Sequence, residues 1–167
     1  SQSLDDALGD DAVNIFGLLG QGWAALNCTN YQCNNGNDGW MGALVSFEGG
    51  KGYWLIAIDD FDFTFNNPEG NLTRIAHQPA IRSVPEMHRF MQSSSQAFYF
   101  IESATIYGKT LDSEDIIIAY NGDVVVGARY WNGEYTDVPA MGMDDYSNSE
   151  GYCKSGDRIS FKVLDAS

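Results

Sequence analysis

The chain has 167 residues, enough for one domain or two small ones with a buried core. Its formal net charge is −14 and its isoelectric point is near 4.1. Because phosphate groups are bound by clustered Lys and Arg, this charge argues against nucleic acid and anionic membrane surfaces as partners. No apolar stretch is long enough for a membrane span, so we expect no membrane insertion.

The first half of the chain predicts one short helix followed by strands. Residues Ser3 to Gly9 are typical of a helical turn, with Ser3 as N-cap and acidic residues behind it. Glycines at positions 17, 20 and 22 would destabilise a longer helix, so strands are expected after Ala12. The expected strands are Val13 to Leu18, Gly22 to Asn27, Trp40 to Phe47, Tyr53 to Ile58 and the alternating segment Phe61 to Phe65.

The segment from Asn71 to Ser95 differs from its neighbours because it is basic and contains Pro79 and Pro85. We interpret it as a connector with an edge strand, either packed by charge against an acidic neighbour or solvated as a linker. It holds both histidines, His77 and His88, but no nucleophile motif or H-E-x-x-H pattern accompanies them.

The second half is organised around residues Asp115 to Trp131. Two apolar runs, Ile116 to Tyr120 and Val124 to Val126, flank Asn121-Gly122, which predicts a hairpin with a type I′ turn. Both runs are continuously apolar rather than alternating, so both faces of the hairpin should be covered. The other expected strands are Gln96 to Ile106, Asp137 to Met141 and Arg158 to Leu164.

Short strands with frequent turn signals predict a mainly β fold, made of two small β-sandwich-like units with one short N-terminal helix. We expect an N-terminal β unit with a cysteine loop over residues 1–70 and a connector over residues 71–95. A C-terminal β-sandwich unit is expected over residues 96–167.

The three cysteines bear on the compartment. Cys28 and Cys33 lie in the polar loop NCTNYQCNNGND, where a local disulfide would imply an oxidising, extracellular or cell-surface location. A zinc site is the alternative, but it needs two further ligands. Cys153 is left over, and is either buried and inert or bonded to another subunit.

Two motifs together carry a resemblance. GWMGAL at residues 39–44 and GKGYWL at 50–55 are followed by QAFYFI at 96–101 and NGDVVVGAR at 121–129. This order resembles the tandem β modules of large secreted bacterial surface proteins, over nearly the whole chain. The resemblance implies an exported repeat module and a fold rather than an activity, and it supplies no catalytic residues. The family has a cysteine where Val125 stands here, so a disulfide at that point is excluded.

Two N-x-S/T sequons make Asn27 and Asn71 candidate glycosylation sites, because both fall in predicted loops. The pattern is short and the chain is rich in Asn, so chance matches without a glycan are the alternative.

An acidic loop near the C-terminus is a candidate calcium site, since calcium takes about six to eight oxygen ligands from flexible loops. A solvated acidic loop is the alternative, because the EF-hand spacing is absent. No other cofactor is required. The candidate ligands are Asp144, Asp145, Asn148 and Glu150.

Aromatic residues surround the turn Asn132-Gly133 and would form a flat carbohydrate-binding platform if their rings were exposed. Strand alternation would instead send about half of them into the core. The residues are Tyr130, Trp131 and Tyr135.

These features favour a non-enzymatic extracellular structural or adhesive module, assembling into a fibre or surface layer. Its expected partners are copies of itself or neighbouring repeats, and glycans in addition if it is an adhesin. The alternative is a carbohydrate-binding module assisted by calcium. A hydrolase is disfavoured because no pair of carboxylates is marked by its surroundings.

Overall fold

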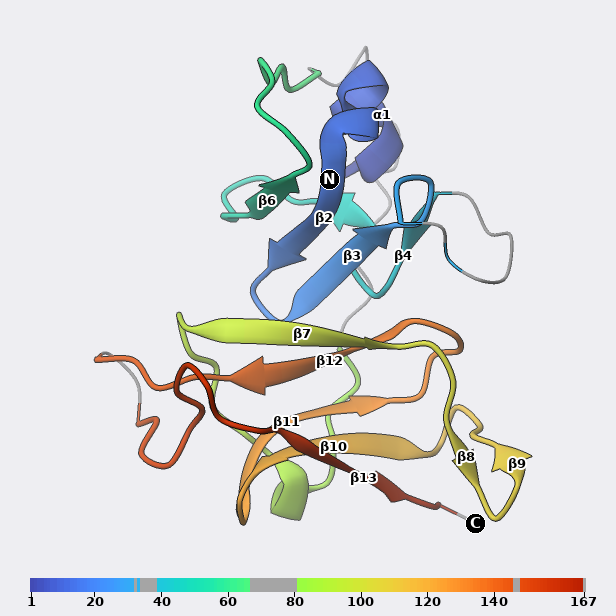
Figure 1. The fold of residues 1–167 in the computed structure, drawn as a ribbon, viewed down its shortest axis with the longest axis vertical. Coiled ribbons are helices and arrows are strands. Elements are labelled where there is room, and N and C mark those ends of the chain that lie inside the picture. Colours follow the sequence, from blue (N-terminus) through green and yellow to red (C-terminus); the bar gives the residue numbers. More distant parts are fainter. Residues whose placement is uncertain (32, 34–38, 67–80, 146–147, 167) are drawn as a thin grey trace. The chain divides into compact units, whose positions relative to one another are not determined.

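The computed structural model describes residues 1–31, 33, 39–66, 81–145 and 148–166. The chain is mainly β and divides into two compact units, Ser1–Ala80 and Ile81–Ser167 (Figure 1). The division falls inside the segment expected to be a connector. Residues 81–95 belong to the second unit, so the linker reading does not hold for them.

The N-terminal unit begins with the predicted helix. In α1 (Leu4–Leu8) the Ser3 hydroxyl accepts a hydrogen bond from the backbone N–H of Asp6 at 3.1 Å, which makes Ser3 the N-cap. Leu4 and Leu8 are four residues apart and therefore lie on one face of the helix. Both are buried in the core of this unit, which also contains Ile15, Leu18, Ala25 and Leu44.

The strands of this unit form a four-stranded antiparallel sheet in the order β4-β3-β2-β6. They are β2 (Ile15–Gly20), β3 (Trp23–Asn27), β4 (Trp40–Met41) and β6 (Trp54–Ala57), and the 3-10 turn η1 (Gly9–Asn14) precedes them. The single strand expected from Trp40 to Phe47 is instead two short ones. Its second part, β5 (Ser46–Phe47), pairs with β1 (Gln2–Ser3) outside the main sheet.

The alternating segment Phe61 to Phe65 was predicted to be a strand, and this prediction is wrong. Its backbone is held by the helical N-terminus and not by a neighbouring strand: the Thr64 N–H donates to the Asp11 carboxylate at 2.8 Å. The rings pack edge-to-face on one another, with centroids 6.3 Å apart for Phe63 and Phe65. The alternation here reflects a row of packed aromatic rings, and among the described residues no strand pairs with this segment.

The core of the C-terminal unit is formed by two small sheets, β11-β10-β13 and β12-β7, and a third sheet is the short β8-β9 pair (Figure 1). Their apolar residues meet in one core, with Ile117, Val126 and Val138 among its members. This arrangement agrees with the predicted sandwich-like unit. The elements are η2 (Glu86–His88), β7 (Gln96–Ile101), β8 (Thr105–Ile106), β9 (Lys109–Thr110), β10 (Ile116–Asn121), β11 (Val124–Tyr130), β12 (Thr136–Met141) and β13 (Ser160–Leu164).

The predicted hairpin is present, but its turn is shifted by one residue. Asn121 pairs with Val124, so the two loop residues are Gly122 and Asp123. Positive φ occurs at Gly122 (59°) and not at Asn121 or Asp123. Positive φ confined to the first loop residue is typical of a type II′ turn, which favours glycine there, and differs from the expected type I′.

Strand β10 is covered on both faces, as its continuous apolar run predicted. Ile117 and Ala119 face the core between the sheets. Ile116 and Ile118 face the other way, where Val84 and Phe90 pack against their cluster. Residues 81–90, which we call the strap, therefore take the place of a second layer on this side of the sheet.

The two sheets are in close contact at Gly127. A Cβ built at this position would overlap the carbonyl oxygen of Pro139 in β12, so the two backbones are in direct contact there. Close by, the buried Arg129 donates from Nε to the Asp137 carbonyl at 2.9 Å and from Nη2 to the Asp137 carboxylate at 3.1 Å. Burial lowers the pKa of Arg129, and the charge and hydrogen bond of Asp137 oppose this shift.

We predict that Gly127→Ala destabilises the C-terminal unit by about 3 kcal/mol, because β12 must move away from β11 to admit a methyl group. The measurement is urea unfolding followed by tryptophan fluorescence. Gly108→Ala is the matched control: its Cβ meets nothing within 4 Å, so only its positive φ costs energy, about 1 kcal/mol. Equal losses in both variants would contradict a steric role for Gly127.

Candidate functional site

The disulfide is present. Cys28 and Cys33 are joined with Cα atoms 5.2 Å apart, immediately after β3. Both sulfurs are consumed in this bond, so the alternative of a zinc site at these two cysteines is excluded. The backbone N–H of Cys28 donates to the Gly39 carbonyl at 2.8 Å, which fixes the exit of the loop beside its entrance.

The Asn27 side chain of the first sequon is buried in the folded chain. The side chain is 3% exposed, and its Nδ2 donates to the Ala12 carbonyl at 2.9 Å. A glycan is attached through Nδ2, so a sugar would replace this hydrogen bond and displace a buried side chain. The prediction of Asn27 as an acceptor is therefore corrected for the folded chain. The second sequon, Asn71, lies outside the described residues, as does His77.

The acidic loop is hydrogen-bonded to the segment that precedes β7. The Asp144 carboxylate accepts hydrogen bonds from the Ser93 hydroxyl at 2.8 Å and from the backbone N–H of Ser94 at 2.7 Å. It thereby ties the end of β12 to the start of β7. Asp145, Asn148 and Glu150 are exposed. Within the described residues no group of three or more His, Cys, Asp or Glu side chains could hold a metal ion.

The aromatic platform is not formed. Trp131 and Tyr135 are 6% and 4% exposed, and Trp131 belongs to the core between the sheets. Only Tyr130 is partly exposed, and the Arg82 guanidinium lies over its ring, 3.8 Å from the centroid. Buried ring faces cannot stack on a sugar, so for Trp131 and Tyr135 the structure favours the alternative that their rings lie in the core.

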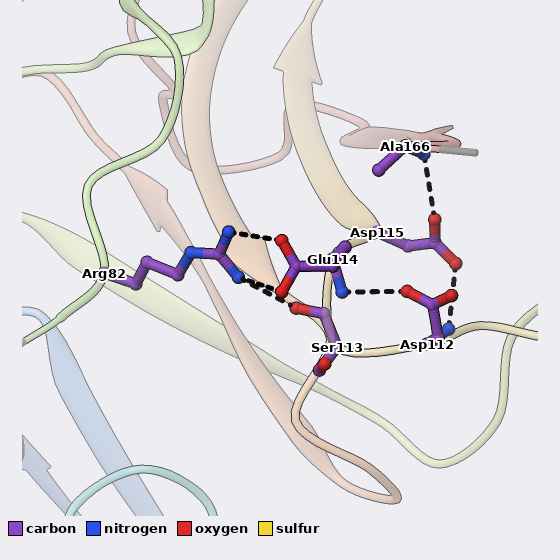
Figure 2. Close-up of polar contacts among 6 residues, drawn as sticks. All are labelled: Arg82, Asp112, Ser113, Glu114, Asp115 and Ala166. Atoms are coloured by element: carbon purple, nitrogen blue, oxygen red, sulfur yellow. Dashed lines mark hydrogen bonds and ion pairs between the residues drawn. The ribbon is translucent and has the colours of Figure 1, made fainter.

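The Arg82 side chain attaches the strap to the loop that precedes β10 (Figure 2). Its Nη1 and Nη2 donate to the two carboxylate oxygens of Glu114 at 2.8 and 2.5 Å. Nη1 also donates to the Ser113 carbonyl at 3.2 Å. A bidentate pair of this kind fixes orientation as well as distance. In the described part of the basic segment, Arg82 is thus packed by charge against an acidic neighbour within the same unit, which was one of the two alternatives.

The receiving loop is itself held in place (Figure 2). The Asp112 carboxylate accepts from the Glu114 backbone N–H at 2.8 Å, and the Asp115 carboxylate accepts from Asp112 at 2.9 Å. The second oxygen of Asp115 accepts from the Ala166 N–H at 3.1 Å, beyond the end of β13. One acidic turn therefore anchors both the strap and the C-terminal segment.

Among the described residues, His88 and Cys153 are not part of a catalytic or metal-binding cluster of side chains. Neither ring nitrogen of His88 has a hydrogen-bond partner there. Cys153 is a partly buried free thiol, and burial raises its pKa. A raised pKa keeps the sulfur protonated and slows disulfide exchange.

Two strands end their sheets without a further partner among the described residues. The β6 edge, residues 54–58, pairs only with β2, and Trp54, Ile56 and Ile58 on it are 53%, 42% and 49% exposed. The β13 edge, residues 158–164, pairs only with β10, and exposes Phe161 and Leu164. Sequence reasoning identified both strands but not their edge positions, since a continuous apolar run such as that of β6 usually indicates a buried strand.

Comparison with known proteins gives no relative: no protein-family model, no curated protein and no solved structure matches this chain. No helix in the described part of the chain is both long and apolar enough to cross a membrane.

The ion pair of the strap predicts a pH dependence. Its hydrogen bond to Arg82 holds the pKa of Glu114 below the ordinary 4.5, so the pair stabilises the folded unit above that pH. The stabilisation is lost as the pH falls through the lowered pKa of the folded state. We expect Glu114→Gln to speed hydrogen exchange of residues 84–90 at neutral pH but not in acid.

Glu86→Gln is the control for this prediction, because it removes a carboxylate of the strap and leaves the Arg82 pair intact. An unchanged exchange rate in Glu114→Gln at neutral pH would show that the apolar contacts alone hold the strap. Both charged side chains are more than half exposed, so added salt should weaken the effect.

The disulfide predicts a stability difference. Closing so short a loop restricts the unfolded chain by about 2 kcal/mol, which the variant Cys28→Ala/Cys33→Ala should lose in urea unfolding. Reductant should shift the wild-type curve to the position of the variant and leave the variant unchanged. A reductant effect of equal size on both proteins would contradict this assignment.

Proposed function

We propose that this chain is a non-enzymatic extracellular structural or adhesive module that assembles with copies of itself. The observation that carries the proposal is the β6 edge. Among the described residues the outer side of β6 has no strand partner, and three apolar side chains along residues 54–58 are exposed, Trp54, Ile56 and Ile58. Such an edge is suited to accept a strand from another chain.

The sequence of the β6 edge supports the proposal because it lacks charged residues and proline, although β6 itself is short, with four residues. Soluble proteins shield edge strands with charges, prolines or short lengths. Residues 54–58 read WLIAI and contain neither a charge nor a proline. An unprotected edge in an isolated monomer is a risk of aggregation, so its retention is best explained by a partner that covers it.

Two further features support an extracellular setting. A Cys28–Cys33 disulfide persists in oxidising compartments and is rare in the cytosol. The resemblance of the GWMGAL and QAFYFI motifs to secreted bacterial surface modules points the same way. A carbohydrate-binding function has lost its main support, because Trp131 and Tyr135 are buried.

The test is assembly of the purified chain. We expect filaments or sheets in negative-stain microscopy and concentration-dependent growth in sedimentation velocity. Ile56→Lys should abolish growth, because a charge placed on the edge faces the incoming strand. Met87→Lys is the matched control, since Met87 is an exposed apolar residue in η2, far along the chain from β6. A dispersed wild-type monomer at all concentrations would overturn the proposal.

A further inference from the structure

We propose that the β13 edge of one copy adds antiparallel to the β6 edge of the next, so that copies join head to tail. The inference rests on the proposed function and names the two surfaces that perform it. The occupant of each edge is therefore a second copy of this chain. The argument comes from side-chain complementarity along the two edges.

An antiparallel alignment that sets Asp60 opposite Arg158 also sets Trp54 opposite Leu164. Trp54 and Leu164 lie within β6 and β13, whereas Asp60 and Arg158 lie just beyond these strands, so the second pair forms only if both strands lengthen on assembly. Trp54 and Leu164 are both exposed in the single chain. Directly opposed side chains of this kind interact across strands, so the apolar pair at one end and the ion pair at the other fix the same register.

The opposite face fits as well. The same alignment sets Ala57 opposite Phe161, a small side chain beside a large one. The Phe161 ring is 37% exposed and packs edge-to-face on the Tyr99 ring, with centroids 5.1 Å apart. The space beside Ala57 would receive that ring and continue the core of one unit into the next.

Charge favours this pairing over pairing of like edges. The β6 edge is followed by Asp59, Asp60 and Asp62, whereas the β13 edge carries Arg158 and Lys162. Antiparallel pairing of β13 with itself about Ser160 would place Arg158 against Lys162, and like charges directly opposite are destabilising. Pairing of β6 with itself would close a dimer and leave Phe161 and Leu164 uncovered.

The two edges lie in different units of the chain, β6 in the first and β13 in the second. A contact between them is heterologous, and each added copy keeps one unused edge of each kind. Heterologous contacts that do not close into a ring generate an open filament.

The experiment is disulfide trapping between two populations. One carries Trp54→Cys and the other Leu164→Cys, both in a Cys153→Ser background. Opposite residues of an antiparallel pair have Cα atoms about 5 Å apart, within the range for a disulfide. On mild oxidation we expect the mixture to give a covalent dimer in at least about tenfold excess over either population alone.

Tyr107→Cys replaces Leu164→Cys in the control mixture. Tyr107 is 96% exposed in the turn between β8 and β9, so it reports random collision at equal accessibility. Equal dimer yields in the test and control mixtures would overturn the pairing. Dimers from the Trp54→Cys population alone would instead identify a closed β6 dimer and also overturn it.

Two readouts separate the inference from the proposed function. Wild-type filaments without Trp54–Leu164 trapping would overturn this pairing and leave self-assembly intact. Absence of wild-type assembly at every concentration would overturn both. A single chain carrying both substitutions that links within itself at high dilution would show that the two edges meet inside one molecule, which also overturns the pairing between copies.

Discussion

The C-terminal unit depends on covering both faces of β10. Residues 116–119 are all buried, although they alternate between the two sides of the sheet. One side is covered by β12 and β7, and the other by the strap. If either cover were absent, isoleucine side chains would be exposed in the middle of the sheet, at a cost of about 2 kcal/mol for each large one.

The β12-β7 sheet and the strap are attached to β10 and β11 by different kinds of interaction. The second sheet is held by direct backbone contact at Gly127 and by the buried pair of Arg129 and Asp137. A buried pair must stay intact, because removing one partner leaves a charge with poor solvation. The strap is held by apolar contacts and by the exposed pair of Arg82 and Glu114. Exposed pairs contribute little energy, so the strap is the cover that opens at lower cost.

Local signals in the sequence predicted local structure well. Ser3 before an apolar helix turn, a glycine between β-branched runs, and two cysteines five residues apart in a polar loop each specify geometry over a few residues. The failures involve distant partners. Whether Trp131 is exposed depends on β12 and on Tyr152. Tyr152 belongs to the same core cluster but lies many residues later in the sequence. Phe61 to Phe65 alternate like a strand, but a strand also needs a neighbour, and the helical N-terminus takes its hydrogen bonds instead.

The edge positions of β6 and β13 could not be predicted from local sequence either, because they depend on which distant strands pair with them. In the proposed assembly, the net charge of the chain would disfavour other contacts between copies. With a formal charge of −14, two copies repel each other at most orientations, which disfavours unspecific apolar contact. This repulsion is screened beyond about 8 Å at physiological salt, so it selects orientation at short range. The basic residues Arg158 and Lys162 make the β13 edge a local exception to the acidic surface. In the proposed assembly, one basic strand edge and one uncharged apolar edge on an acidic chain would favour a single way of joining copies.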